Sequence, residues 1–445
     1  MPSPAAGGLR LPAHRRALRA ALAPAVLAAA CSFDPAGSGS PPTQSGGLDS
    51  GSGSVADAGS PDGSVAPPPD SGGGTPDADS CRDLLPFAPS NVDSCELGAV
   101  RAALSLEDDG VYSLDTDTGT LTSPGGEQET LVGVVVDQDG GPDIFATATA
   151  SFTLGPDSRL RVTGSRGLAL VAVGDISIAG GGDGGIDVGA MADASGPGGD
   201  SDEGCAGSGR GDPGAAQVDG DFDPAGSGGG GGGFAAAGGI GAEVDAVPGA
   251  PATGGGSPVG TPRLVPLRGG CAGGAGGVSG GTAGGAGGAL QLVAGGGIVV
   301  DGIVTARGGG GGNVTDIHAG GGGGGAGGGL LFEATTIDVN GAVTANGGGG
   351  GEGSRRFVPT ASGDDGGDVV GQPAPGGGGT GSGGDGGNGG ALDSEEGQGG
   401  LVGEPSGFDL AGGGGGGGSA GRIRLRSIAR QTLIGPGAVV SPADG

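Results

Sequence analysis

Residues 289–312, ALQLVAGGGIVVDGIVTARGGGGG, join two kinds of sequence that seldom occur side by side. The first half alternates Leu, Val and Ile with other residues, which is typical of a β-strand. The second half ends in the glycine run 308–312, and glycine is the residue that loses most backbone entropy on folding. Of the 445 residues, 123 are Gly and 31 are Pro, a proportion that usually indicates disorder. The apolar strands nevertheless predict that part of the chain folds.

The first half of this stretch belongs to an internal repeat. LQLVAGGGIVVDG at 290–302 matches LALVAVGDISIAG at 168–180, and shorter or looser copies occupy 330–341 and 423–437. A short second segment follows each copy, at 186–189, 303–306, 342–345 and 438–441. A single short β unit cannot bury its apolar stripe, whereas stacked units can. The repeat therefore predicts an all-β fold, an irregular β-helix or solenoid.

The same repeat predicts which side chains face the core and where the glycine lies. The expected inward residues are Leu170, Ile176, Ile178, Leu292, Ile298 and Val300. Glycine-rich stretches of unequal length separate the copies, so we expect long insertions on one edge of the stack. The long glycine runs are either disordered or packed as left-handed extended chains. Since loop length costs little, removing residues 348–351 is expected to have almost no effect.

Three stretches carry a resemblance to a known group of proteins. GVYSLDTDTG at 110–119, VTGSRGLALVAVGDISIAGG at 162–181 and residues 288–312 resemble glycine-rich lipoproteins of GC-rich Gram-negative bacteria and, more distantly, filamentous-haemagglutinin-type surface proteins. The resemblance implies a right-handed β-helix and brings no catalytic residues. GGAGG at 273–277 and GGDGGNGG at 383–390 are similar in composition to PGRS domains.

The amino terminus indicates export. Four Arg residues precede an apolar run of 11 residues at 20–30, which is too short to span a bilayer and typical of a signal peptide. The run ends VLAAAC, which resembles a lipobox and implies that the Cys31 thiol carries lipid. Cleavage after Ala30 without lipidation is the alternative. Residues 31–80 hold seven Asp and no base among Gly, Ser and Pro, and we expect them to form a disordered, lipid-anchored linker.

Two further regions complete the expected organisation. Residues 81–155 are predicted to form an amino-terminal β module, with a helix over 96–106 and a strand over 143–154. Alternate residues of this strand are expected on one side: Ile144, Ala146, Ala148, Ala150, Phe152 and Leu154. Residues 156–445 are predicted to form the glycine-rich repeat domain. If Cys31 carries lipid, four of the five Cys residues remain in an oxidising compartment, and we expect the disulfides Cys81–Cys95 and Cys205–Cys271.

Charge and composition limit the possible chemistry. The net charge of −30 opposes binding to nucleic acid. His318 is the only His after residue 30, so one chain cannot build a multi-His metal site or a His-based triad. Asp137, Asp139 and Asp143 in DQDGGPD partly resemble a calcium loop, and we take them as candidate calcium ligands. Solvated turn carboxylates are the alternative, and no other cofactor is expected.

These features favour a non-enzymatic lipoprotein of the outer membrane or cell surface, with a structural, display or adhesion role. Its expected partners are the membrane, through Cys31, and surface polysaccharide or neighbouring cells. The alternative is a secreted β-helix enzyme that acts on polysaccharide, for which acids such as Asp200, Asp202 and Glu203 would serve. A carboxylate cluster beside an Arg in a groove would favour that alternative, although the repeats offer few aromatic side chains for sugar stacking.

Overall fold

The structure is a computed structural model that describes residues 83–443 apart from 183, 218–223, 245–250, 356–359, 369–370, 380–382, 393 and 405–409. The chain divides into two units between Gly72 and Gly73. The described residues all belong to the second unit. The expected signal peptide, Cys31, the whole linker and Cys81 lie outside the described residues.

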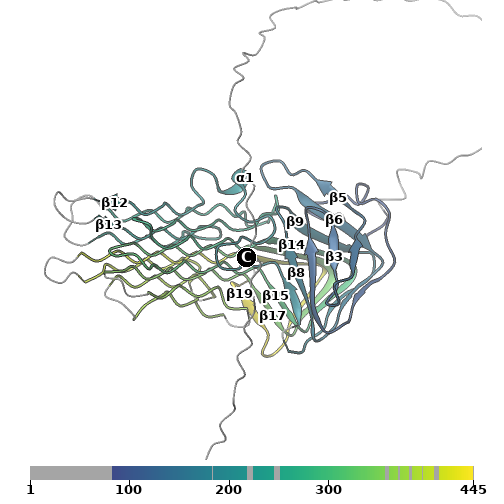
Figure 1. Cartoon of the computed structure of the whole chain (residues 1–445). Helices are drawn as coiled ribbons and strands as arrows, with labels where there is room; N and C mark the ends of the chain where they lie inside the picture. Colours follow the sequence, from purple (N-terminus) through teal and green to yellow (C-terminus); the bar gives the residue numbers. More distant parts are fainter. Residues whose placement is uncertain are drawn as a thin grey trace, which may run out of the picture. The chain divides into compact units, whose positions relative to one another are not determined.

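The described residues are almost entirely β-strand and extended chain (Figure 1). The one helix among them, α1 (Asp202–Cys205), is a single turn, and no helix in this part of the chain is long and apolar enough to cross a membrane. The strands are β1 (Leu104–Leu106), β2 (Gly110–Asp115), β3 (Thr120–Thr122), β4 (Gln128–Thr130), β5 (Gly133–Val136), β6 (Ile144–Thr149), β7 (Phe152–Leu154), β8 (Ser158–Thr163), β9 (Gly167–Ala172), β10 (Ile176–Ile178), β11 (Gly185–Asp187), β12 (Ala216–Gln217), β13 (Ala225–Gly226), β14 (Ala289–Val300), β15 (Ile303–Thr305), β16 (Gly329–Val339), β17 (Ala342–Thr344), β18 (Arg422–Ile434) and β19 (Val439–Ser441).

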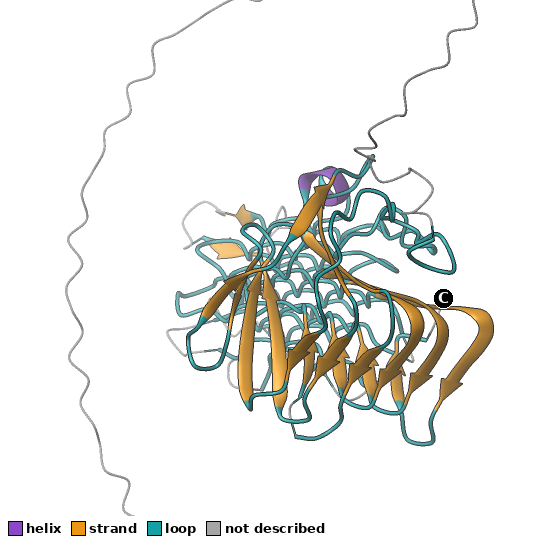
Figure 2. Cartoon of the chain, turned by 90° about the vertical axis from the view of Figure 1, so that its right-hand side faces the viewer, coloured by secondary structure: helices purple, strands orange, loops and turns teal. Residues whose placement is uncertain are grey.

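Most of these strands stack as parallel coils (Figure 2). Each later coil begins with a long strand, β14, β16 or β18, and ends with a short one, β15, β17 or β19. The first half of β14 pairs with β9 and its second half pairs with β10, so two earlier strands correspond to one later strand. The short strands pair in parallel in a second sheet. The all-β fold and the repeat that predicts it are confirmed.

The register of the coils builds continuous apolar columns. One column consists of Leu168, Leu290, Leu330 and Ile423, which are partners in successive strands. All six residues predicted to face the core are buried in the same hydrophobic core cluster as this column. Since each column is buried only when its neighbours stack above and below, the fold depends on the repeat as a whole.

Three local expectations are wrong. Residues 96–106 form no helix, because Leu104–Leu106 pair with β7 and alternate between buried and exposed positions. The strand expected over 143–154 breaks between β6 and β7, so Ala146 and Phe152 enter different core clusters. The second segments of two copies are shifted by one residue, since Gly185, and not Ile186, is the partner of Ile303, and Val439 is the partner of Ala342.

The sheets are mixed, because antiparallel strands close one end of the stack. β3 and β4 continue the second sheet beyond β2, and β5 continues the first sheet beyond β6. The buried side chains of Leu121, Leu131 and Phe145 cover the core at this end. The strands before and after residue 155 pair within these same two sheets.

A strap of residues 84–97 covers the outer face of the first sheet. Its Leu85, Val92 and Leu97 join a second core cluster with residues of β6, β9, β14 and β16. The fully buried carboxylate of Glu333 accepts hydrogen bonds from Ser90 N and Oγ at 2.9 and 2.6 Å and pairs with Arg426. The strap therefore supplies the partners that allow a charged side chain to be buried on this face.

The glycine-rich insertions form an ordered bundle of extended chains beside the stack (Figure 1). Residues 320–325 show the pattern, in which each amide donates to a carbonyl oxygen of a neighbouring chain. The amides of 320 and 323 donate to a first chain, at 277 and 274. Those of 321 and 324 donate to a second chain, at 413 and 416, and those of 322 and 325 to a third, at 312 and 309. Every third residue thus bonds the same neighbour. A period of three is that of the left-handed extended helix, so the packed alternative for the glycine runs is the correct one.

Close packing explains why these positions are glycine. A Cβ built on Gly323, Gly324 or Gly325 would lie within 3.0 Å of a carbonyl oxygen of a neighbouring chain, a separation that real Cβ atoms essentially never show. The runs at 228–233, 320–325, 347–351 and 412–418 each exchange hydrogen bonds with several different chains. Outer chains instead follow a Gly-Gly-x pattern in which x, such as Ala275 or Asp385, is exposed. Unbroken glycine therefore marks the interior of the bundle.

Candidate functional site

The turns at the far end of the bundle are one candidate for contact with a partner. The chain returns from the turn at Val278–Ser279 to β14 over residues 280–288, a distance of roughly 28 Å at about 3.1 Å per residue. Val278, Ser279 and His318 hold positive φ angles of 57°, 51° and 57°, which mark sharp turns. β12 and β13 lie at this same end (Figure 1). The rigid bundle thus carries side chains far from the coils.

An acidic pocket of about 440 Å³ lies where the bundle meets the stack. Its charged lining residues are Asp137, Asp143, Arg166, Asp200 and Glu203. Sequence reasoning treated Asp137 and Asp143 separately from Asp200 and Glu203, and the fold brings the two groups to one cavity. A pocket with four carboxylates and one guanidinium suits a cation or a polar, hydroxyl-rich ligand.

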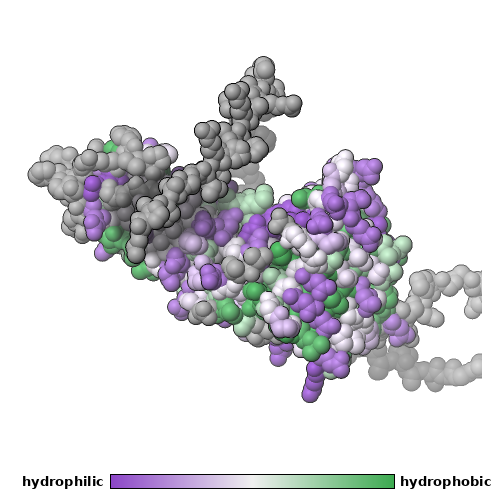
Figure 3. All heavy atoms as spheres, turned by 90° about the horizontal axis from the view of Figure 1, so that it is seen from below, coloured by the Kyte–Doolittle hydropathy of each residue, from purple (hydrophilic) through white to green (hydrophobic). Residues whose placement is uncertain are grey.

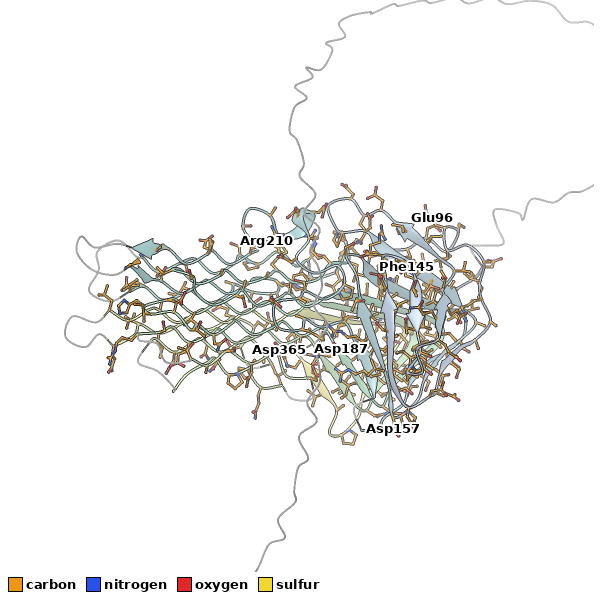
Figure 4. All side chains as sticks on the ribbon, viewed as in Figure 1. Glu96, Phe145, Asp157, Asp187, Arg210 and Asp365 are labelled. Atoms are coloured by element: carbon orange, nitrogen blue, oxygen red, sulfur yellow. A yellow bond between two sulfur atoms is a disulfide. The ribbon has the colours of Figure 1, made fainter. Side chains whose placement is uncertain are left out.

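Two structural links fix the wall of this pocket. Arg210 beside α1 (Figure 4) pairs with Asp200 at 2.8 Å and with Asp202 at 2.9 Å. Hydrogen bonding to Asp200, the largest contribution, raises the pKa of Arg210 above its ordinary value. The Cys205–Cys271 disulfide, with sulfur atoms 2.04 Å apart, ties α1 to the adjoining glycine chain. The sequence predicted two disulfides, and this one is confirmed. Cys81–Cys95 stays a prediction because Cys81 is not described.

The three candidate calcium ligands do not form one cluster. Asp137 and Asp139 line a second cavity of about 990 Å³ under the strap, and Asp143 lies 3.8 Å from Arg166. Gln138, between Asp137 and Asp139, is buried. Its Nε2 donates to the Leu267 carbonyl oxygen and its Oε1 accepts from the Leu267 amide. Within the described part of the chain, no group of three or more His, Cys, Asp or Glu side chains is arranged to hold a metal ion. Calcium binding stays a prediction.

A buried ion cluster lies at the junction of stack and bundle, around Asp187 (Figure 4). The Asp187 side chain is 5% exposed and pairs with Arg159 and Arg161 at 2.7 Å and with Arg307 at 3.3 Å. Asp368 pairs with Arg307 at 2.7 Å. Burial alone would raise the pKa of Asp187, but the Arg guanidinium groups outweigh it and hold that pKa below its ordinary value.

Sequence reasoning missed this cluster, although a signal for it exists. Asp187 is the partner of Arg161 and of Thr305 in the second sheet. The predicted alignment placed Asp187 beside Val304, one residue from its partner Thr305, and it did not include β8, which supplies Arg161. Because both carboxylates of the cluster are ion-paired to Arg, the arrangement fits a structural joint between β8, β11 and the bundle.

Comparison with known proteins adds no identification. No family model, no curated protein and no solved structure matches the chain.

On the face seen from below, hydrophilic and hydrophobic side chains are intermixed (Figure 3). The case for function therefore depends on the geometry above.

Proposed function

We propose that the protein is a non-enzymatic cell-surface lipoprotein with a display or adhesion role. In this proposal lipid on Cys31 anchors it to the outer membrane and residues 31–80 are a spacer. The coil stack is a right-handed β-helix that serves as a base, and the glycine bundle is an arm that presents its far turns to surface polysaccharide or to neighbouring cells.

The observation that carries the proposal is the hydrogen-bond network of the bundle. Each interior chain donates to three neighbours in rotation, so that a sequence with no core side chains is held straight. The bundle holds a small apolar cluster, Ala225 and Val244 with Leu410 packed against them, and depends otherwise on these backbone hydrogen bonds. Such an arm suits the presentation of turns at a distance. Many tethered copies would strengthen individually weak contacts.

The test compares strains for attachment and aggregation. One strain lacks the protein. A second expresses a chain in which the far turns, residues 278–280 and 313–318, are replaced by Gly–Ser segments of the same lengths. A third has a Gly–Ser segment in place of residues 124–126, in the β3–β4 turn. The proposal predicts that the second strain behaves like the deletion and that the third behaves like wild type.

The cellular side of the proposal has its own test. Protease added to intact cells should remove the protein from the surface, and Cys31→Ser should release it from membranes. If the protein resists protease in intact cells and is cleaved only after lysis, it faces the periplasm and the display role is wrong. A chelator that weakens attachment would support calcium bridging through Asp137 or Asp139.

The acidic pocket favours a second candidate, an enzyme that acts on polysaccharide. Asp143, Asp200 and Glu203 beside Arg166 are the carboxylate–arginine arrangement that such an enzyme would use. The lining of this pocket holds no aromatic side chain for stacking on a sugar ring. Release of reducing ends from an acidic polysaccharide by wild type, and its loss in Glu203→Gln, would establish this candidate in place of display.

A further inference from the structure

The two ends of the coil stack differ in how their cores are covered. At the β1 end, Leu121, Leu131 and Tyr112 are buried and complete the core. At the other end, β18 and β19 have neighbours on one side only, β16 and β17. Ile434, which continues a core column, is 49% exposed there, and Leu433 beside it is 65% exposed. In stacked-repeat proteins a capping element covers the core of the last repeat, and within the described residues this end has no such cap.

The open end is basic in a chain that is otherwise acidic. β18 carries Arg422, Arg424, Arg426 and Arg430, and no Asp or Glu occurs in residues 410–442. Arg422 and Arg424 donate to backbone carbonyl groups, Arg426 pairs with the buried Glu333, and Arg430 is exposed. An isologous contact between two β18 edges would set Arg beside Arg. The charge of this end instead calls for an acidic surface.

The β1 end of the same chain has such a surface. β1 is the last strand of its sheet and has a free edge, and Glu107, Asp108 and Asp109 follow it. A groove of about 450 Å³ lies between β1 and β4. Its charged lining residues are Asp108, Glu127, Glu129 and Arg101, and Arg101 pairs with Glu129 at 2.9 Å, so Asp108 and Glu127 give the groove its net negative charge. One end is therefore an open basic edge and the other an acidic groove with an open edge.

The direction of the strands also matches. β1 is parallel to β7, and β7 is parallel through β10, β14 and β16 to the second half of β18. An insertion in β18, where three residues replace the one between Ala334 and Thr336 of β16, separates Gln431–Ile434 from the first half of the strand. The segment Gln431–Ile434 is the part of the open edge in line with β1.

We propose that the open β18 end of one molecule docks on the β1 end of a second copy. The contact is heterologous, so that each molecule offers both surfaces and the stack continues from one copy to the next. Leu433 and Ile434 lose their exposure in this contact, and Arg430 approaches the acidic groove. The contact is independent of the bundle turns and of the display role proposed for them.

The experiment uses the full-length chain in sedimentation velocity over a concentration series. The tail variant is Leu433→Asp and the head variant is Glu127→Arg. Their controls are Leu401→Asp, at a bundle residue with a similar exposure of 58%, and Glu396→Arg, at another exposed acid. Circular dichroism establishes that each variant is folded.

Wild type and both controls should rise in average mass with concentration, and added salt should reduce the rise. Each single variant should lose the concentration-dependent rise. An equimolar mixture of head and tail variants should regain dimers and nothing larger, because each then has one intact surface. The proposal is overturned if wild type stays monomeric throughout, or if the head variant still associates while the tail variant does not, which indicates a tail-to-tail contact.

Discussion

At the scale of single residues, glycine in the bundle acts through the absence of a side chain. The interior positions have carbonyl oxygens of other chains where a Cβ would stand. The sequence alone left disorder and packing open, because a run of glycine carries no side-chain pattern from which neighbours can be inferred. What decides between them is the set of partner chains, and these come from insertions far apart in the sequence.

Substitution of an interior glycine tests this steric account. Gly324→Ala places a Cβ against the carbonyl group of Gly348, so chains must move apart, and we expect a loss of at least about 1–3 kcal/mol in the free energy of unfolding. Gly125→Ala is the matched control, since its nearest atom is Ser123 Oγ at 3.7 Å. Chemical denaturation measures both variants. Equal stability of the two would contradict close packing at Gly324.

Asp187 provides a prediction about pH. Its pKa is lower in the folded protein than the ordinary value, so its ion pairs stabilise the fold above the ordinary pKa of about 4 and lose this effect as pH falls through the folded pKa. Asp187→Asn leaves three Arg side chains without this partner and should cost about 3–5 kcal/mol at pH 7.

The measurement is the midpoint of denaturation for wild type and Asp187→Asn from pH 7 downward. The difference between them should shrink below about pH 4, since wild-type Asp187 then takes up its proton as well. Asp157→Asn, at an exposed acid, is the control and should stay within about 0.5 kcal/mol of wild type. A difference that is constant with pH would show that the charge of Asp187 is not what stabilises the junction.

At the scale of elements, the sequence predicts the stacked strands well and the insertions poorly. The column of Leu168, Leu290, Leu330 and Ile423 follows from side-chain alternation, which each copy repeats. The second segments form strands of only three residues, β11, β15, β17 and β19. Alternation is too short there to fix the register, and the predicted alignment is wrong by one residue for two of them. The sequence does not predict the strap, because Ser90 and Asn91 bond to Glu333 and Gln291, which lie 243 and 200 positions away in the chain.

The threefold period of the bundle chains gives an element-scale prediction that runs against ordinary experience with loops. In GGDGGNGG, Asp385 and Asn388 are three residues apart on the outer side of the bundle, whereas Gly386 and Gly387 pack inward. Deleting Gly386 alone turns one of these side chains by about a third of a turn into a neighbouring chain. Deleting residues 386–388 keeps the period.

Thermal unfolding should therefore give a lower midpoint for the one-residue deletion than for the three-residue deletion. The same reasoning replaces the expectation that residues 348–351 are dispensable, because these residues hydrogen-bond chains on several sides. A series in which stability falls simply with the number of residues removed would contradict the threefold arrangement of this chain.

At the scale of the whole described unit, two architectures share one junction. The coil stack has a hydrophobic core of Leu, Ile and Val, and the bundle has backbone hydrogen bonds and glycine. The Asp187 cluster joins them at the junction through Arg307 and Asp368, and the Cys205–Cys271 disulfide links α1 to a glycine chain of the same insertion. The sequence indicated both parts as a repeat with insertions, but not that the insertions assemble with one another.

The central claim is that the glycine runs form an ordered, hydrogen-bonded bundle, and amide hydrogen exchange measures this most directly. The measurement compares peptides that cover 228–233, 320–325 and 412–418 with peptides that cover β14 and β16. The account predicts protection of the glycine amides approaching that of the strands, because each one donates to a neighbouring chain. Exchange of these amides at the rate of an unfolded chain, while β14 and β16 stay protected, would contradict it.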